Sequence, residues 1–329
     1  IVLIILGALL FCIALYDTLQ ASDPILRNFP VVGHFRSLLS TSGPKLRQYI
    51  VAANDEERPF SRDQRTWVYS TASGHNAYVG FGTDSVIDRG SHIIIKQSAF
   101  PDTTPTGENA PLPCAKVMGA WRDRTHKFRP ESVVYVSAMS YGSLSARAVE
   151  AINRGCAITG SMQNTGEGGV AYPHRNGGKL IFQFGTGYFG CRNTDGTFSL
   201  DALLETVGSA EVGCIEIKLS QGAKPGLGGV LPGKKVTPAI AKARGVEMGQ
   251  TVYSPNRHSA FDDVDGLIDF IEMIANATGL PVGIKSAVGQ QNFWDELAGR
   301  MAARSEGPDF IAIDGGEGGT GAAPLAFTD

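Results

Sequence analysis

The chain has 329 residues, of which 43% are hydrophobic, and its formal net charge is −3. This mild acidity gives no electrostatic case for nucleic-acid binding, which calls for a basic face. The five cysteines show no CxxC spacing and the histidines show no ligand spacing, so we expect buried thiols and no metal site in the sequence given.

The first segment, residues 1–16, carries no charge and only one glycine. A bilayer-spanning helix needs about 20 apolar residues, with about 17 as the lower limit. The segment falls just short, and residues upstream of Ile1 would complete it. A buried core helix and a signal-peptide core are the alternatives, although no small-residue cleavage site comes after Tyr16. Lys and Arg residues downstream place the rest of the chain in the cytoplasm by the positive-inside rule, so we predict a transmembrane anchor over residues 1–20.

Residues 21–130 are rich in Pro, Arg and aromatic side chains, and their hydrophobic periodicity is broken. We expect an N-terminal appendage that packs on other parts of the protein or meets lipid headgroups. The arginines of the segment could serve either role, and we favour a packing appendage with a solvated face.

Residues 131–329 alternate short apolar runs with helical patterns, which is typical of βαβ units in a parallel sheet. The expected strands are residues 133–138, 157–161, 180–184, 214–219, 251–253, 282–284 and 310–313. Seven strands are one short of a (β/α)8 TIM barrel. We therefore predict an α/β fold of this kind whose last unit lies beyond Asp329.

Two helices are predicted between these strands. The first places Leu144, Ala148 and Ile152 on one face and is expected to end at Gly155. The second contains Leu267 and begins among Asp262, Asp263 and Asp265, which are good N-caps, and it stops at residue 279, a glycine.

Three glycine-rich stretches, residues 163–169, 221–226 and 315–322, each come after an apolar run. Glycine allows positive φ and a close approach of the backbone to a ligand. Because functional residues of a parallel barrel lie on the loops after its strands, we expect these loops to converge on one flat or phosphorylated ligand.

Two charged residues stand out at the predicted site. Glu167 lies between glycine pairs that offer it no packing surface, so it is expected to orient an amine or to exchange protons with an imine; a solvated loop carboxylate is the alternative. Lys285 ends a predicted strand, where its ammonium would hold negative charge on a bound ligand; a surface lysine is the alternative. Residues 228–235 nearly match a phosphate-binding loop, but Lys235 stands where Ser or Thr must bind Mg²⁺, which argues against a nucleotide triphosphatase.

Together, the stretches 139–145, 163–169 and 221–236 resemble the flavin-binding synthase domain of glutamate synthase. Residues 28–34 and 59–65 resemble the membrane-anchored bacterial members of that family. The resemblance implies an FMN-containing barrel that reduces 2-iminoglutarate, formed from 2-oxoglutarate and ammonia, to L-glutamate. It also implies an NADPH-linked or ferredoxin electron donor, an iron–sulfur cluster whose cysteines would lie beyond residue 329, and a single-pass location in the bacterial inner membrane.

The resemblance also implies roles for individual residues. Glu167 and Lys285 would be catalytic. The flavin would be bound by Met139, Ser140, Tyr141, Gly142, Gln183, Lys285, Gly318, Gly319 and Thr320. The substrate would be bound by Asn164, Gln221, Lys224 and His258.

The chain departs from the family where Met162 and Phe182 stand near positions that are usually basic. Cations that could hold a dicarboxylate would thus be lost, each pairing being worth on the order of 1.5–3 kcal/mol. Two alternatives stay open on this basis. One is an FMN barrel acting on another amine or 2-oxo acid, like an N-methylglutamate synthase, and the other is a membrane-tethered barrel without catalysis.

Overall fold

The structure is a computed structural model that describes residues 2–49, 60–75, 96, 98–100, 115–316, 318–319 and 323–327. The chain divides into two units, residues 1–103 and residues 104–329. The first contains the helices α1 (Val2–Leu19), α2 (Pro24–Asn28), α3 (Val32–Tyr49) and α4 (Arg62–Ala72).

Helix α1 consists almost entirely of apolar side chains, and nearly all of them are exposed. Within the described residues, it is the one helix long and apolar enough to cross a bilayer. Membrane anchors and signal segments share both properties. Near its end, the buried Asp17 carboxylate accepts a hydrogen bond from the Val31 N–H (2.9 Å) and meets His34 Nε2 (2.9 Å), which ties the start of α3 to α1.

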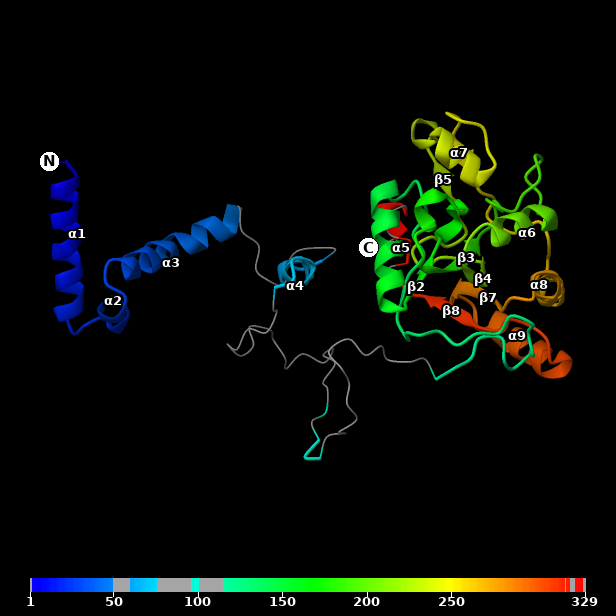
Figure 1. Cartoon of the computed structure of the whole chain (residues 1–329), viewed down its shortest axis with the longest axis horizontal. Coiled ribbons are helices and arrows are strands. Elements are labelled where there is room, and N and C mark those ends of the chain that lie inside the picture. The colour runs from blue at the N-terminus through cyan, green and yellow to red at the C-terminus, as the bar shows by residue number, and fades with distance from the viewer. Residues whose placement is uncertain are drawn as a thin grey trace. The chain divides into compact units, whose positions relative to one another are not determined.

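The second unit contains a curled, six-stranded parallel sheet in the order β1-β2-β3-β4-β7-β8. Its strands are β1 (Tyr135–Val136), β2 (Met162–Asn164), β3 (Lys179–Phe184), β4 (Val212–Lys218), β7 (Val282–Ala287) and β8 (Ile311–Asp314). Figure 1 shows helices around this sheet; they are α5 (Ala146–Thr159), α6 (Leu200–Gly208), α8 (Val264–Thr278) and α9 (Gln291–Arg304). The arrangement is consistent with a partial TIM barrel. The predicted α/β class with a parallel sheet is therefore confirmed.

Two of the seven expected barrel strands were wrong. The run 157–161 largely continues α5, because Val149 and Cys156 share the buried face of that helix and the left-handed C-cap is Gly160 rather than Gly155. The run 251–253 forms β6 (Val252–Tyr253), but it pairs antiparallel with β5 (Val230–Leu231) in a separate ribbon. That ribbon and helix α7 (Pro238–Arg244) form an insertion between β4 and α8. Helix α8 runs from its N-cap Asp263 to its C-cap Gly279 as predicted.

The two faces of the sheet differ in chemistry. Because side chains alternate along a strand, Leu180 and Phe182 of β3 pack outward with α6 and α8 in the main core. On the other face, Met162, Ile181 and Cys214 form a smaller apolar cluster. Further along the same strands this inner face becomes polar and then charged, which positions the site.

Residues 118–128 pack at the end of the sheet where the strands begin. Met118 and Phe128 form an antiparallel bridge. Between them, the buried Arg124 guanidinium donates to both carboxylate oxygens of Glu272 (2.6 and 2.8 Å) and to Asp309 (3.0 Å). This network joins the segment before β1 to α8 and to the start of β8.

Candidate active site

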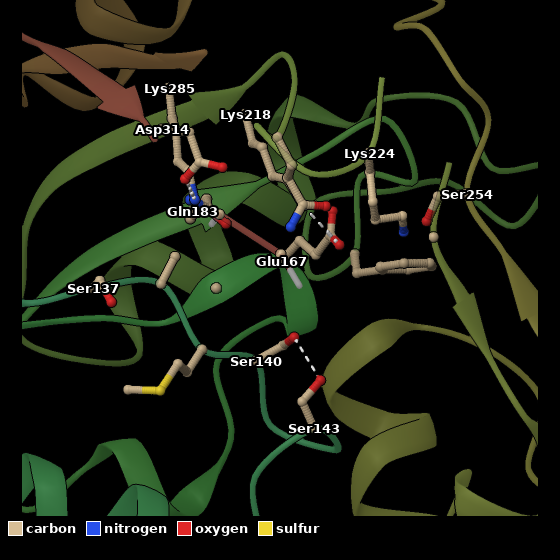
Figure 2. Close-up of a pocket in the computed structure, with 18 of the residues that line it drawn as sticks. Ser137, Ser140, Ser143, Glu167, Gln183, Lys218, Lys224, Ser254, Lys285 and Asp314 are labelled. Atoms are coloured by element: carbon tan, nitrogen blue, oxygen red, sulfur yellow. Dashed lines mark hydrogen bonds and ion pairs between the residues drawn. The ribbon is translucent and has the colours of Figure 1, made fainter. Parts of the chain in front are cut away.

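A cavity of about 750 Å³ lies where the parallel strands end. Five of its lining residues come from the second halves of strands β3, β4, β7 and β8, and the others come mainly from the loops after the strands and from the β5–β6 insertion. The lining includes Met139, Ser140, Glu167, Gln183, Phe189, Lys218, Gln221, Lys224, Arg244, Ser254, Lys285, Asp314, Gly318 and Gly319. Figure 2 shows charged side chains from several elements pointing into this space.

Glu167 and Lys218 form an ion pair in the cavity wall (Figure 2), with 3.0 Å between Oε1 and Nζ. Glu167 comes from η1 (Gly166–Gly168), while Lys218 is the last residue of β4. The Lys218 side chain is 10% exposed. Burial lowers the pKa of its ammonium, and the Glu167 carboxylate opposes that effect. The pair therefore places one acidic and one basic group where a substrate could reach them.

A second ion pair joins neighbouring strands. Lys285 Nζ lies 2.9 Å from Asp314 Oδ1, and Asp314 Oδ2 accepts a hydrogen bond from the Gly222 N–H (2.9 Å). Lys218 and Lys285 are register partners on β4 and β7. Each of these adjacent ammonium groups thus has its own carboxylate, which offsets their mutual repulsion.

Below these pairs lies a buried polar network centred on Glu216. Its Oε1 accepts hydrogen bonds from Gln183 Nε2 (2.6 Å) and Asn164 Nδ2 (2.9 Å), whereas Oε2 has no partner within the described residues. Burial raises the pKa of the Glu216 carboxyl, although the two amide donors oppose this. Asn164 also accepts from the Gly166 N–H (3.0 Å). The network therefore fixes the Gln183 amide and the base of the Glu167 loop.

Close backbone packing brings the loop after β1 against the loop after β2. A Cβ at Gly166, whose φ is +62°, would lie 2.5 Å from the Ser140 nitrogen. Met139 and Ser140 consequently line the cavity. Tyr141 instead packs in a neighbouring apolar cluster, and Gly142 lies against Ile240.

Arg244 reaches the cavity from α7 of the insertion. Its guanidinium lies over the Phe189 ring, 4.9 Å from the centroid, and its Nη2 donates to the Tyr141 carbonyl (3.4 Å). Burial lowers the pKa of Arg244, while the Glu167 carboxylate opposes the shift. With Lys224, this arginine adds two cations to the wall, and neither forms an ion pair within the part of the chain that the structure describes.

His258 is satisfied entirely by the protein. Its Nε2–H donates to the Lys218 carbonyl (2.9 Å), and its Nδ1 accepts from the Tyr188 hydroxyl (3.1 Å). This tautomer is assigned because Tyr188 itself accepts the N–H groups of Ser259 and Ala260. Burial lowers the pKa of the imidazole, so the ring is neutral near pH 7. His258 thus supports the end of β4 from outside the cavity.

Met162 and Phe182 lie away from the cavity. Met162 is in the apolar cluster of the inner sheet face, and Phe182 is fully buried in the outer core. Phe182 therefore points away from the cavity, whereas Met162 lies on the same inner face as the cavity. The two residues pack in apolar clusters, and the interpretation that they replace substrate-binding cations stays a prediction.

Most residues expected to form the site do meet at the cavity: Met139, Ser140, Glu167, Gln183, Gln221, Lys224, Lys285, Gly318 and Gly319. Tyr141, Gly142, Asn164 and His258 lie behind it, and Thr320 lies outside the described residues. The sequence prediction missed Lys218, Asp314 and Arg244. Asp314 comes just after an apolar run as Lys285 does, and Lys218 is the charged residue near the end of another run, so this signal could have revealed both.

The fold and site define an α/β-barrel type of protein with a charged cavity at the carboxyl ends of its strands. Residues 115–329 match the family model described as the conserved region in glutamate synthase. The chain therefore belongs to the glutamate synthase family.

Curated relatives agree with this assignment. The glutamate synthase large subunit-like protein YerD of Bacillus subtilis is 34% identical over 95% of this chain and 66% of its own length. The archaeal-type glutamate synthase [NADPH] of Thermotoga maritima is 41% identical over 60% of this chain and 36% of its own length. A ferredoxin-dependent glutamate synthase of Cyanidium caldarium is 32% identical over 57% of this chain and 13% of its own length. The chain thus spans about two thirds of the first relative and about a third of the second.

Proposed function

We propose that this protein is an FMN-dependent oxidoreductase that reduces 2-iminoglutarate, formed from 2-oxoglutarate and ammonia, to L-glutamate. The observation that carries the proposal is the charge of the cavity. Four cations line it, namely Lys218, Lys224, Lys285 and Arg244, against two carboxylates, Glu167 and Asp314. A surplus of two positive charges suits a dianionic 2-oxo acid, and guanidinium and ammonium groups bind carboxylates by charge-assisted hydrogen bonds.

The residues present fit FMN. The cavity volume lies within the usual range of about 300–1,000 Å³ for cofactor sites. Gly229 has no side chain where a Cβ would point at Glu167 Oε1 from 3.6 Å, which leaves room beside the carboxylate. Met139, Ser140, Gln183 and Lys285 would hold the flavin. When bound, it would supply the hydride that reduces the imine carbon.

The chain's own groups would supply binding and proton transfer. Lys224 and Arg244 would bind the carboxylates of the substrate. Glu167 would orient ammonia and exchange a proton with the imine nitrogen, while Lys218 holds the Glu167 carboxylate in place. Lys285 would stabilise negative charge at the flavin, as its position in β7 beside the cavity suggests.

We further propose that α1 anchors the protein in a bacterial inner membrane with the barrel in the cytoplasm. Its length of 18 residues, its apolar composition and its exposure support this. An NADPH-linked subunit or ferredoxin would supply electrons, in line with the names of the two glutamate synthases. An iron–sulfur cluster held by cysteines beyond residue 329 is part of the proposal.

The visible absorption spectrum of the flavin tests the proposed reaction. The purified flavoprotein is reduced under anaerobic conditions, and 2-oxoglutarate and ammonium are added singly and together. We expect the oxidised-flavin absorption band to return only when both are present. A flavin that stays reduced with ammonium but is reoxidised with methylammonium would indicate an N-methylglutamate-type reaction. A flavin that no 2-oxo acid reoxidises would refute the proposal, and so would a protein without flavin.

Substitutions at the two unpaired cations then test the substrate. Lys224→Met and Arg244→Met should each raise the 2-oxoglutarate concentration for half-maximal reoxidation by about 10- to 100-fold, because each removes a charged hydrogen bond worth about 1.5–3 kcal/mol. Lys234→Met is the matched control, since this exposed lysine lies outside the cavity lining.

A further inference from the structure

A second cavity, of about 460 Å³, lies on the other side of α7 from the candidate active site. Its wall combines residues after β2, residues around α6 and residues of the α7 region. Three cations line it, Arg175, Arg192 and Lys242, against one carboxylate, Glu205. We call this space the α6–α7 cavity.

None of the cations of the α6–α7 cavity forms an ion pair with a carboxylate within the described ranges of the chain, and the exposed Asp195 interacts with Arg192 only at longer range. Arg192 donates one hydrogen bond, from Nη1 to the Gly187 carbonyl (3.2 Å), and its buried Nε has no partner there. Arg175 donates to the Ser209 hydroxyl (3.0 Å) and is otherwise exposed. Unpaired cations around a concave space attract an anion with several acceptor oxygens.

The size and charge of the cavity limit the ligand. Its volume lies within the range of about 300–1,000 Å³ for small-molecule sites, so it holds more than an inorganic ion. The surplus of two positive charges matches a dianion. Tyr172, which also lines the wall, adds an exposed aromatic ring.

Two structural links connect this cavity with the candidate active site. The first is the Phe189 ring, which contacts two guanidinium groups: Arg192, from the α6–α7 cavity, lies 5.5 Å from its centroid, and Arg244, from the active site, lies 4.9 Å away. Along α7 and its C-cap, Lys242 and Gly245 face the α6–α7 cavity, while Arg244 faces the active site.

The backbone provides the second link. Gly169 ends the loop that carries Glu167, and its φ is +76°. A Cβ at this position would overlap the carbonyl oxygen of Ala243. Ala243 is also one of the residues that line the α6–α7 cavity. A shift of α7 would therefore press on the Glu167 loop as well as move Arg244.

We propose that the α6–α7 cavity binds a small organic dianion, either a phosphate monoester or a dicarboxylate, and that its occupation changes substrate affinity in the active site through α7 and Phe189. The binding half stands on the cavity alone. The coupling half rests on the proposed function, because it takes 2-oxoglutarate as the ligand of the other cavity.

Calorimetry of the flavoprotein tests the binding. Phenyl phosphate and phthalate are matched probes, since each joins a dianion to one aromatic ring; the phosphate is dianionic above its second pKa of about 6. We expect at least one to bind, and the Arg175→Gln/Lys242→Gln variant to weaken that binding at least about 10-fold, with Lys234→Gln as the control. The stronger probe identifies the ligand class. No binding, or binding that the double variant leaves unchanged, would overturn the site.

The coupling has its own readout. The dissociation constant of 2-oxoglutarate is measured without turnover, with and without the stronger probe, and we expect a change of at least about threefold that disappears in the double variant. Linkage requires the probe's affinity to change by the same factor. Probe binding without this change would overturn the coupling. Absence of 2-oxoglutarate binding would count against the proposed function, while the first experiment still decides the site.

Discussion

Replacing Glu167 by Gln should weaken folding, because the change leaves the Lys218 ammonium without the carboxylate it pairs with. Nζ and Oε1 are 3.0 Å apart, and the Lys218 and Glu167 side chains are 10% and 23% exposed, respectively. At that separation and an effective dielectric constant of about 20, the Coulomb attraction is about 5–6 kcal/mol. Partial access of water to Glu167 reduces the net value, so we expect a coupling free energy of about 2–4 kcal/mol.

A double-mutant cycle measures this coupling directly. Glu167→Gln, Lys218→Met and the double variant are compared with the unchanged protein by urea denaturation, with circular dichroism as the readout. The Glu167→Gln variant alone should lose about 3 kcal/mol or more, because it buries an unpaired charge. The double variant should recover part of that loss, since neither charge remains.

The reference pair is on the same chain. Arg154 and Glu150 are separated by four residues on α5, with 2.8 Å between Nη2 and Oε1 and with side chains 64% and 24% exposed. A cycle on this pair should give only about 0.3–0.5 kcal/mol. Equal coupling energies for the two pairs, or a value near zero for Glu167 and Lys218, would refute the argument that burial strengthens the active-site pair.

Three other substitutions test separate parts of the fold. Gly169→Ala should lower both stability and 2-oxoglutarate affinity, measured by melting and titration, because the new methyl group overlaps the Ala243 carbonyl oxygen; wild-type values would contradict the packing. His174 is buried and its pKa is lowered by burial from 6.5 to about 4, so the unfolded chain binds more protons between these values and stability falls as pH drops from about 6.5 to 4. His174→Asn should remove about 3 kcal/mol of that pH dependence in unfolding titrations, and an unchanged slope would exclude a neutral buried imidazole. Arg124→Met should cost about 3–5 kcal/mol in urea denaturation, because it leaves the Glu272 carboxylate without its bidentate partner; a loss below about 1 kcal/mol would show that the ion pair adds little.

Local patterns were sufficient for much of the fold and for several site residues. The alternation of apolar runs and helices indicated the parallel sheet, and the caps at Asp263 and Gly279 marked the ends of α8. Lys285 and Glu167 were found because one ends a predicted strand and the other lies between glycines. These signals depend only on neighbouring residues in the chain, so they can be recognised without knowing which distant residues each one contacts.

The insertion shows where such reasoning fails. The run ending at Tyr253 has strand-like residues, but its partner is Val230 in an antiparallel ribbon rather than a neighbour in the barrel. An apolar run of two or three residues carries no record of which strand it will pair with. Arg244 likewise entered the site only because the insertion folds back over Phe189.

The period of each strand and the residues at its end can be read from the amino-acid order alone, because both depend on backbone geometry and local chemistry. The three-dimensional fold was needed to tell which face of each strand meets helices and which faces the cavity, and it placed Phe182 in the outer core and Met162 on the inner face. It was also needed to pair Lys218 with Glu167. Contacts of this kind join residues that are distant in the chain, and they depend on strand order and loop packing, which no local periodicity encodes.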